Sequence, residues 1–253
     1  MPELGVVNED AFETMDWAVY EARMHGVRLF APLVDNYDYY HGGNDPKVQE
    51  FYTNLVIIAD FKNYIKILLA HINPYTGLSY ADDPTIFAYK TGNELGEPKF
   101  QAMNVPVAWT AEIASYIKKL APMKFVVHGT YGINKTHLSI KDVDIFSDHF
   151  YPPNNTKLTN GIDLVASADK VYFAAEYDHF WSLFTHNVPD CTTYVNHSGD
   201  SFTLQYGNPA KPVNVTEQAI KIRQHLFRIK GEIVDASLPI APCPGPDADL
   251  LNT

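Results

Sequence analysis

The chain has 253 residues, of which 46% are hydrophobic, and this size and composition suit one large domain with a sizeable buried core. Its formal net charge of −11 argues against a nucleic-acid partner, because proteins that bind phosphate backbones present basic surfaces. No apolar run is long enough to span a membrane, so no membrane association is expected. The same acidity is common among soluble proteins, so it excludes partners without identifying a function.

Apolar helices alternate with short apolar strands along the chain. The first helix is predicted to begin at Asn8, which can cap it, and to end at Gly26, a residue type that terminates helices. Helical spacing of apolar residues recurs in 61–72, 109–120, 162–168 and 216–230, the last helix being capped by Thr216 and ended by Gly231. Short apolar runs predict strands at 27–34, 85–89, 124–128, 142–147 and 170–175.

This alternation predicts an α/β fold with a parallel sheet. Polar residues follow the ends of several strands, namely Asn36, Asn93, Glu94, His128, His149, Tyr151 and Glu176. Functional groups at the C-terminal ends of many strands are typical of a (β/α)8 TIM barrel, whereas a doubly wound fold would favour a glycine-rich first turn, which is not present. We therefore expect a barrel domain over residues 1–238, followed by an irregular tail over 239–253.

Two of these residues are carboxylates that each end a hydrophobic strand, Glu94 in IFAYKTGNEL and Glu176 in VYFAAEYDH. A carboxylate buried without a partner is costly, so each either pairs with a cation, for which Lys90 is the neighbour of Glu94 in sequence, or serves a reaction. Retaining glycosidases need two carboxyls about 5 to 5.5 Å apart, one ionised to attack the anomeric carbon and one protonated to release the leaving oxygen. Strands on opposite sides of a small barrel can supply such a pair.

The ordered motifs TGNEL, DHFYP and AAEYD resemble glycoside hydrolase family 5, a family of retaining barrel hydrolases. The segments HGVRLFAPLVDNYDYYHGG and YADDPTIFAYKTGNE are similar to its endo-β-1,4-mannanase branch, in fungal-type secreted forms. The resemblance extends from about Asp16 to Gly231. It implies a retaining endo-hydrolase that acts on β-1,4-mannan or a related polysaccharide and uses no metal and no cofactor.

The resemblance also implies a role for individual residues. Glu94 would be the general acid/base and Glu176 the nucleophile. Asn93 would bind the sugar 2-hydroxyl, and His149 would line the same subsite. Tyr151 would orient Glu176, and Trp181 would be the platform on which the sugar stacks. Asn36 is a further candidate for substrate binding. Without the ordered motifs, a histidine or tyrosine in a loop is more often a surface hydrogen-bonder, and a tryptophan in an apolar run is more often part of the core.

The chain departs from the family's pattern in two places. It opens on a helix that leads into the family's third strand, and the first two strands, with the arginine of the second, have no counterpart. Glu176 is followed almost directly by Phe180–Phe184, which the family places in its eighth strand, although parallel strands need a crossover of about a dozen residues. We therefore expect an incomplete barrel that lacks two strands and the seventh helix, from an incomplete gene model or a decayed copy.

Two alternatives stay open from the residues alone. An inactive carbohydrate-binding remnant would keep Trp181 and the tyrosine-rich DNYDYY loop as platforms without a productive pair of carboxylates. A β-1,4-glucanase of the same family is the second alternative that the sequence does not exclude, because mannose and glucose differ only at the 2-hydroxyl. No histidine pair has helical metal-ligand spacing, and no G-x-S-x-G nucleophile motif is present.

Four N-glycosylation acceptor motifs favour a secreted glycoprotein; they begin at Asn134, Asn154, Asn196 and Asn214. Cys191 and Cys243 form either a disulfide or two buried thiols, and secretion favours the disulfide. The first residues do not have the pattern of a signal peptide, so we expect the N-terminus to be incomplete. A monomer in the extracellular space is expected.

Overall fold

A computed structural model describes residues 8–35, 48–96, 104–150 and 155–175, together with several residues between 217 and 237. The chain divides into two compact units, Met1–Ala174 and Ala175–Thr253, and each is described by itself. Cys191 and Cys243 lie outside the described residues, as do the predicted domain boundary after residue 238 and the segment Phe180–Phe184.

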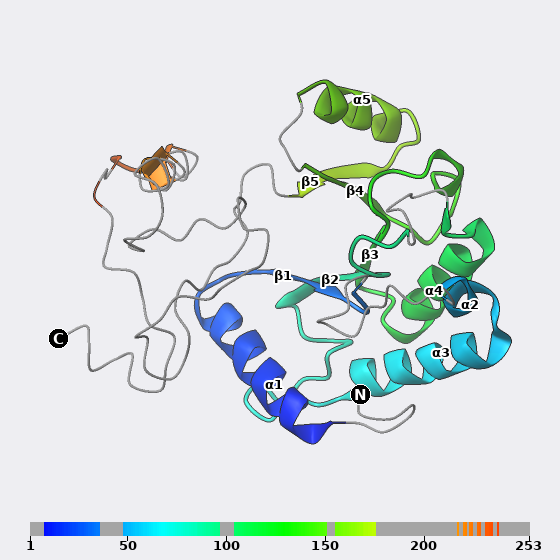
Figure 1. The fold of residues 1–253 in the computed structure, drawn as a ribbon. Helices are drawn as coiled ribbons and strands as arrows, with labels where there is room; N and C mark the ends of the chain where they lie inside the picture. The colour runs from blue at the N-terminus through cyan, green and yellow to red at the C-terminus, as the bar shows by residue number, and fades with distance from the viewer. Residues whose placement is uncertain are drawn as a thin grey trace, which may run out of the picture. The chain divides into compact units, whose positions relative to one another are not determined.

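The first unit alternates helices with strands in chain order (Figure 1). Its helices and strands are α1 (Glu9–Met24), β1 (Leu29–Pro32), α2 (Val48–Thr53), α3 (Leu55–Ala70), β2 (Ile86–Lys90), α4 (Val107–Leu120), β3 (Phe125–Val127), the 3-10 turn η3 (Lys135–His137), β4 (Ile145–His149), α5 (Asn155–Ala166) and β5 (Val171–Ala175). The predicted order of elements is confirmed over these residues, and α2 and η3 were not predicted.

The five described strands form one sheet in the order β1-β2-β3-β4-β5, so each strand lies beside its neighbours in sequence. The pairs β1–β2, β2–β3 and β3–β4 are parallel. A sequential parallel sheet with helices in the connections is the arrangement of a (β/α)8 barrel and differs from a doubly wound sheet, where the strand order reverses. The predicted fold class is confirmed, and the described strands form part of a barrel.

The two ends of α1 illustrate how sequence signals set the elements. The side chain of Asn8 accepts a hydrogen bond from the Asp10 backbone N–H at 3.2 Å and so caps the first turn. Gly26 has a φ of 69°, and the backbone N–H of Val27 bonds the carbonyl of Ala22 at 2.8 Å. Because this left-handed ending satisfies helix carbonyls that would otherwise lack a partner, both predicted ends of the helix are confirmed.

Helix α5 begins well before the predicted start at residue 162. Its first half, NTKLTNG, has little apolar periodicity, so the pattern of apolar residues did not reveal it. Gly161 explains why a glycine is placed within this helix. A Cβ there would lie 2.7 Å from the Tyr172 ring and 2.9 Å from a carboxylate oxygen of Asp148, so glycine allows α5 to pack closely on β4 and β5.

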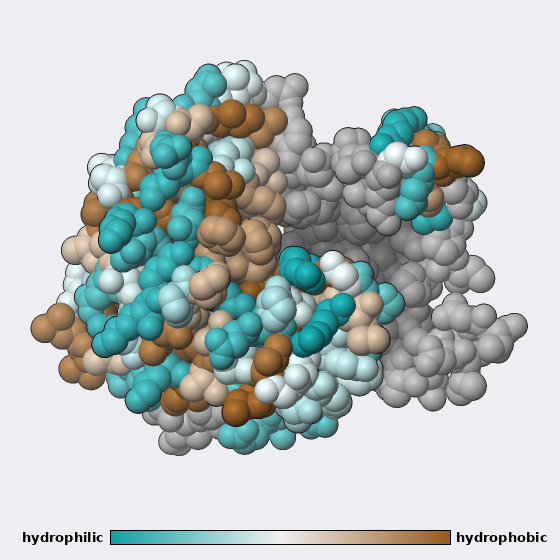
Figure 2. All heavy atoms as spheres, turned by 180° about the vertical axis from the view of Figure 1, so that it is seen from behind, coloured by the Kyte–Doolittle hydropathy of each residue, from teal (hydrophilic) through white to brown (hydrophobic). Residues whose placement is uncertain are grey.

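The sheet has two apolar faces. The outer face packs against the helices in the main core, where Tyr89, Val126 and Phe146 are almost fully buried. The inner face carries a smaller cluster of Ala88, Val127 and Ile145, against which two phenylalanines pack, Phe30 and Phe173. On the surface, hydrophobic and hydrophilic side chains of the described residues are interspersed over one face (Figure 2). Among the described residues, no helix combines the length and the apolar character needed to cross a membrane.

The glycosylation motif at Asn134 lies in the connection between β3 and β4. Asn134 is only 1% exposed, and its side-chain oxygen accepts hydrogen bonds from the Thr136 backbone N–H and hydroxyl at 3.0 and 2.6 Å. A buried capping residue cannot carry a glycan in the folded chain, so this motif is not an accessible acceptor, contrary to the expectation from sequence. The acceptor asparagines of the other three motifs, Asn154, Asn196 and Asn214, lie outside the described residues.

In the second unit, the described residues between Glu217 and Arg228 are helical. Gly231 has a φ of 70°, and the backbone N–H of Glu232 bonds the carbonyl of Phe227 at 3.0 Å. This left-handed ending confirms the predicted role of Gly231 as the helix terminator. The predicted cap Thr216 lies outside the described residues.

Candidate active site

Glu94 lies where the backbone leaves β2 at the C-terminal edge of the sheet. The residue before it, Asn93, is tied to the β1 side, because its backbone N–H bonds the carbonyl of Val34 at 2.7 Å. The residue after it, Leu95, is tied to the β3 side through a 3.0 Å bond to the carbonyl of Gly129. Glu94 itself has a φ of 54°, a left-handed conformation that costs a residue with a Cβ about 1 to 2 kcal/mol. The backbone on both sides therefore holds Glu94 in a strained conformation.

Gly129, which follows β3, brings the backbones of the two strand ends into contact. A Cβ at this position would lie 2.3 Å from the backbone nitrogen of Gly92 and 2.5 Å from its carbonyl oxygen. The Gly129 backbone N–H also donates to the Thr91 hydroxyl at 3.0 Å. Because backbone atoms cannot move aside as a flexible side chain can, only glycine allows this approach. The position of the Gly92–Glu94 segment thus depends on a glycine of the neighbouring strand.

The Glu94 carboxylate is buried against a histidine from β4. Glu94 is 5% exposed and His149 is 3% exposed, and Glu94 Oε1 lies 2.7 Å from His149 Nδ1. On the other side of the imidazole, Nε2 lies 3.0 Å from the Lys90 ammonium. Lys90, His149 and Glu94 therefore form a continuous chain of polar contacts from β2 to β4 and back to the end of β2.

Asn93 takes part in the same network. Its amide nitrogen donates to Asp35 Oδ2 at 3.1 Å, and its amide oxygen lies 3.4 Å from the Lys90 ammonium. Asn93 is only partly buried and has two amide hydrogens, so one N–H can still be offered to a ligand. The order Asp35, Asn93, Lys90, His149 and Glu94 thus links side chains from three strands at the C-terminal edge of the sheet.

His149 is also supported from the side away from Lys90. The Tyr131 ring stacks on the imidazole with centroids 6.3 Å apart and planes at 18°. The Lys157 ammonium donates to the His149 carbonyl at 2.6 Å and pairs with Asp148 at 3.3 Å. The contact with the ring comes from the loop after β3, and the contact with the backbone carbonyl comes from α5, so two elements outside its own strand hold His149.

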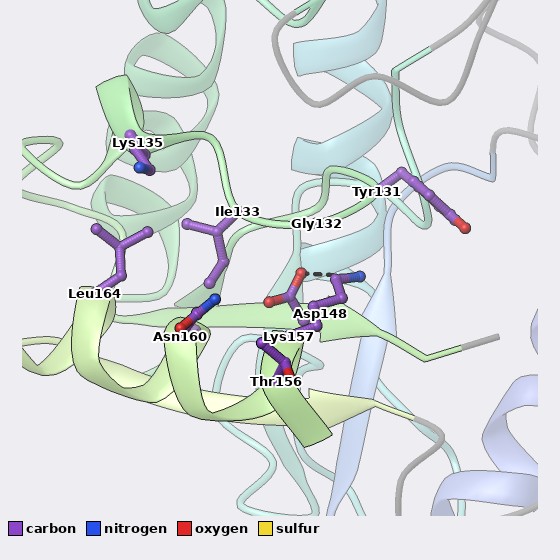
Figure 3. A pocket seen from close by; sticks show the side chains of 10 residues that line it. Tyr131, Gly132, Ile133, Lys135, Asp148, Thr156, Lys157, Asn160 and Leu164 are labelled. Atoms are coloured by element: carbon purple, nitrogen blue, oxygen red, sulfur yellow. Dashed lines mark ion pairs between the residues drawn. The ribbon is translucent and has the colours of Figure 1, made fainter. Parts of the chain in front are cut away.

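A pocket of about 650 Å³ lies between the connection from β3 to β4 and helix α5 (Figure 3). Asp148 and Lys157 pair along its wall, and Figure 3 shows Tyr131 directed away from the other lining side chains. The residues that line it are Tyr131, Gly132, Ile133, Lys135, Asp148, Thr156, Lys157, Asn160, Gly161 and Leu164. The pocket therefore adjoins the Glu94 network through Tyr131 and Lys157 without containing Glu94.

Two histidines beneath the network form a buried pair. His137 Nε2 lies 3.1 Å from the carbonyl of Val105, and His137 Nδ1 lies 2.9 Å from His128 Nε2. A carbonyl only accepts, so His137 carries its proton on Nε2, and His128 donates to His137 Nδ1. Burial lowers the pKa of His128 well below its ordinary value, and the neighbouring His137 and Lys90 add to this effect. Both rings are neutral structural groups at neutral pH.

Of the residues predicted from sequence, the structure brings Asn93, Glu94 and His149 together. Glu176, Tyr151, Trp181 and Asn36 lie outside the described residues, although β5 ends at the residue directly before Glu176. Among the described residues, no three histidine, cysteine or acidic side chains gather as metal ligands would. The roles of all seven residues stay predictions.

Sequence reasoning did not identify Asp35 or Lys90 as members of the network. Asp35 directly precedes Asn36 at the end of the β1 segment, so the polar-residue signal was one position away. Lys90 was considered only as a neighbour of Glu94, yet its contacts include His149 from a strand 59 residues along the chain. Strand alternation could have found it, because Lys90 shares a face with Ala88 on the inner side of the sheet.

Comparisons with known proteins agree with this geometry. A sequence model for GH family 5 beta-mannosidase-like proteins matches residues 14–178. Mannan endo-1,4-beta-mannosidase 1 of Arabidopsis thaliana is 32% identical over 178 residues, which is 58% of this chain and 43% of that protein. The endo-1,4-beta-D-mannanase of Thermotoga petrophila superposes with a TM-score of 0.60 at 27% identity, over 69% of this chain and 65% of that chain. The endo-1,4-beta-mannanase of Rhizomucor miehei gives 0.58 at 25% identity, over 66% and 60%.

The described strands form a sequential parallel sheet, and a buried carboxylate lies at its C-terminal edge. These two features are typical of parallel-barrel proteins, whose polar sites lie at the strand ends. The family model covers well over half of the chain, from residue 14 to residue 178. The chain belongs to glycoside hydrolase family 5 and is β-mannosidase-like. It spans less than half the length of the curated plant relative, so activity and substrate are matters for a proposal.

Proposed function

We propose that this chain is a retaining endo-hydrolase of β-1,4-mannan, with Glu94 as the general acid/base and Glu176 as the nucleophile. The observation that carries the proposal is the contact of Glu94 with His149, at 2.7 Å, on the C-terminal edge of the sheet. A structural carboxylate has no need of a left-handed backbone, whereas strained and buried groups cluster at functional sites. The similar plant, bacterial and fungal proteins are named for mannan as their substrate.

The proposed reaction has two steps. In the first, the Glu176 carboxylate attacks the anomeric carbon while Glu94 gives its proton to the glycosidic oxygen, so the sugar–oxygen bond breaks and a glycosyl ester forms. In the second, the Glu94 carboxylate takes a proton from water as the water oxygen attacks the anomeric carbon. The ester bond breaks, Glu176 regains its negative charge, and the product keeps the original configuration.

The remaining residues would bind the sugar. Asn93 has an amide N–H left for the 2-hydroxyl after its bonds to Asp35 and Lys90. We assign the other contacts with the sugar or with Glu176 to His149, Tyr151, Trp181 and Asn36. Because polymeric mannan does not cross a membrane, an extracellular location accompanies this proposal, as does a monomeric state, since every group named lies in one chain.

The test is the release of reducing ends from β-1,4-mannan by the purified chain, beside Glu94→Gln and Glu176→Gln. Each variant should lose at least about 100-fold in kcat, since a general acid/base contributes that much or more. On an aryl β-mannoside whose leaving group departs without a proton, Glu94→Gln should recover most of its first step and Glu176→Gln should not. A soluble β-1,4-glucan assayed beside mannan distinguishes the glucanase.

The matched control is Glu112→Gln, because Glu112 is exposed and pairs only at the surface, with Lys62 at 2.9 Å. It should keep full activity. A chain that binds mannan without cleaving it would contradict the proposal and support the carbohydrate-binding remnant. Equal activity of the parent and Glu94→Gln on mannan would show that Glu94 is not the acid/base.

A further inference from the structure

We propose that Lys90 is a positioning residue that fixes the tautomer of His149 and so confines the transferable proton of Glu94 to Oε2. This inference rests on the proposed function, because it concerns the same acid/base. Its structural part, the tautomer of His149, can be measured without substrate and without activity. The motivating observation is the run of contacts from Lys90 Nζ to His149 Nε2, at 3.0 Å, and from His149 Nδ1 to Glu94 Oε1, at 2.7 Å.

The hydrogen-bond donors of Lys90 determine which nitrogen of His149 carries the ring hydrogen. A protonated lysine has three N–H donors and no acceptor, so its contact with His149 Nε2 requires that this nitrogen accept. The ordinary pKa of lysine lies about 4 units above that of histidine, so the proton of the pair belongs to lysine. The Asn93 amide oxygen, 3.4 Å away, accepts from the same ammonium and favours its charged form. His149 is therefore neutral, with its single ring hydrogen on Nδ1.

The consequence falls on Glu94. With the hydrogen on Nδ1, His149 donates to Oε1, and Oε1 is an acceptor whether Glu94 is ionised or protonated. When Glu94 carries its proton, that proton must reside on Oε2. The opposite tautomer of His149 would place an N–H against the Lys90 ammonium and let Oε1 hold the proton against the ring. Lys90 thus decides which oxygen of the acid/base can transfer a proton.

Lys90 is placed to do this by the fold. It is 9% exposed, and it lies on the inner face of β2, two residues beyond Ala88. Among the described residues, the charged and titratable side chains around the network come from several elements: Asp35 after β1, His128 after β3, Tyr131 in the next loop and Lys157 on α5. Its positive charge also opposes protonation of His128.

The first experiment records the 15N resonances of the histidine rings in the full chain at neutral pH, without substrate. His149, assigned by its loss in His149→Asn, should show a protonated Nδ1 and an unprotonated Nε2. In Lys90→Met the Nε2-protonated form should appear, whereas Lys62→Met, which removes a partly exposed lysine that pairs with Glu112, should leave the spectrum unchanged. A parent chain with the hydrogen on Nε2, or on both nitrogens, would overturn the proposal even if Lys90→Met does not fold.

The second experiment asks whether the tautomer matters for the reaction, by a double-mutant cycle on mannan. Lys90→Met should lower kcat about 10-fold with little change in KM, because part of the Glu94 population would carry its proton on Oε1, from which it cannot be transferred. In His149→Asn the amide nitrogen replaces Nδ1 and cannot change tautomer, so adding Lys90→Met should have little further effect. Equal losses in both backgrounds would contradict the positioning role. A parent without activity counts against the proposed function, while the ring spectra still decide the tautomer.

Discussion

Phe30 and Phe173 stack face to face, with ring centroids 5.0 Å apart and planes at 14°, although they belong to β1 and β5 at the two ends of the sheet order. In a flat sheet, four strand spacings would separate β1 from β5 by about 19 Å. The contact therefore requires that the sheet curl about its inner face, as the wall of a barrel does. The same two rings cover Ala88, Val127 and Ile145.

The first prediction concerns the stability of this curl. Phe30→Leu and Phe173→Leu should each destabilise the chain, and the double variant should lose less than the sum, with a coupling of about 1 kcal/mol. The measurement is the free energy of unfolding in urea. As a control pair, Phe30→Leu with Phe61→Leu should be additive, because Phe61 packs in the outer core against Trp109. Additivity of the Phe30 and Phe173 variants would mean that the sheet does not depend on the stack.

The second prediction concerns the approach of β3 to the Glu94 segment. Gly129→Ala places a methyl 2.3 Å from the Gly92 nitrogen, so the two strand ends must separate. We expect a loss of about 3 kcal/mol in unfolding free energy, the upper range of overpacking. If the chain cleaves mannan, kcat should fall as well, because a displacement of about 1 Å in a catalytic group is costly.

The control for this variant is Gly77→Ala. Gly77 has open space around it but a φ of 69°, so alanine there should cost about 1 kcal/mol from backbone strain alone, with no effect on Glu94. If Gly129→Ala destabilises no more than Gly77→Ala, the close contact of the two strand ends is not needed for the fold.

Much of the fold followed from local patterns. Asn8 and Gly26 mark the ends of α1 because capping depends on residues within one turn, and the strands were found because they are short apolar runs. The reason for a glycine at position 161 was not evident from sequence, because it is the close packing of α5 against Tyr172 on another element. The same is true of Gly129, whose neighbour Gly92 lies on another strand.

Some residues of the candidate site were predicted from local sequence patterns, and others were not. Asn93 and Glu94 were found because polar residues at the end of an apolar strand are locally conspicuous. Lys90 was not assigned to the site, because a lysine in a strand is ordinarily expected to reach solvent. Strand alternation places Lys90 on the inner face of the sheet, and the packing of β4 beside β3 brings its ammonium to the His149 ring. Contacts between elements, rather than periodicity within them, determine the hydrogen-bond chemistry of this site.

The third prediction concerns a buried anion that holds α1 to the rest of the first unit. Asp16 is 2% exposed, and its carboxylate accepts from the Tyr80 hydroxyl at 2.9 Å and contacts His71 Nε2 at 2.9 Å. Its backbone carbonyl accepts from the Asn73 amide at 2.9 Å, and the Phe12 ring stacks on His71. Asp16→Ala should cost about 3 kcal/mol, because it leaves the buried Tyr80 hydroxyl and the partly buried His71 ring without their acceptor.

Chemical denaturation of Asp16→Ala beside Glu13→Ala tests this. Glu13 is exposed on the same helix, so its replacement should change the unfolding free energy by less than about 0.5 kcal/mol. A loss below about 1 kcal/mol in Asp16→Ala would show that the donors find water or other partners, and that α1 is held by its apolar face alone.

The fourth prediction is a dependence of stability on pH, set by His128. Its pKa is held well below the ordinary value of about 6.5 by burial, then by His137 and Lys90. Above pH 6.5 both the folded and the unfolded chain have this ring neutral, so its contribution to stability is complete. As the pH falls below about 6.5, only the unfolded chain takes up the proton, so stability must fall. The slope from one histidine is at most about 1.4 kcal/mol per pH unit.

Urea denaturation from pH 7.5 down to pH 5 should therefore show a falling free energy of unfolding in the parent, and a shallower fall in His128→Gln. The glutamine amide can donate to His137 Nδ1 as the ring does at 2.9 Å, but it cannot be protonated. His25→Gln is the control, because the His25 side chain is 75% exposed and should leave the slope unchanged. His137, whose pKa is also lowered by burial, keeps part of the slope in both variants. Identical slopes in the parent and His128→Gln would mean that the His128 ring can be protonated without unfolding.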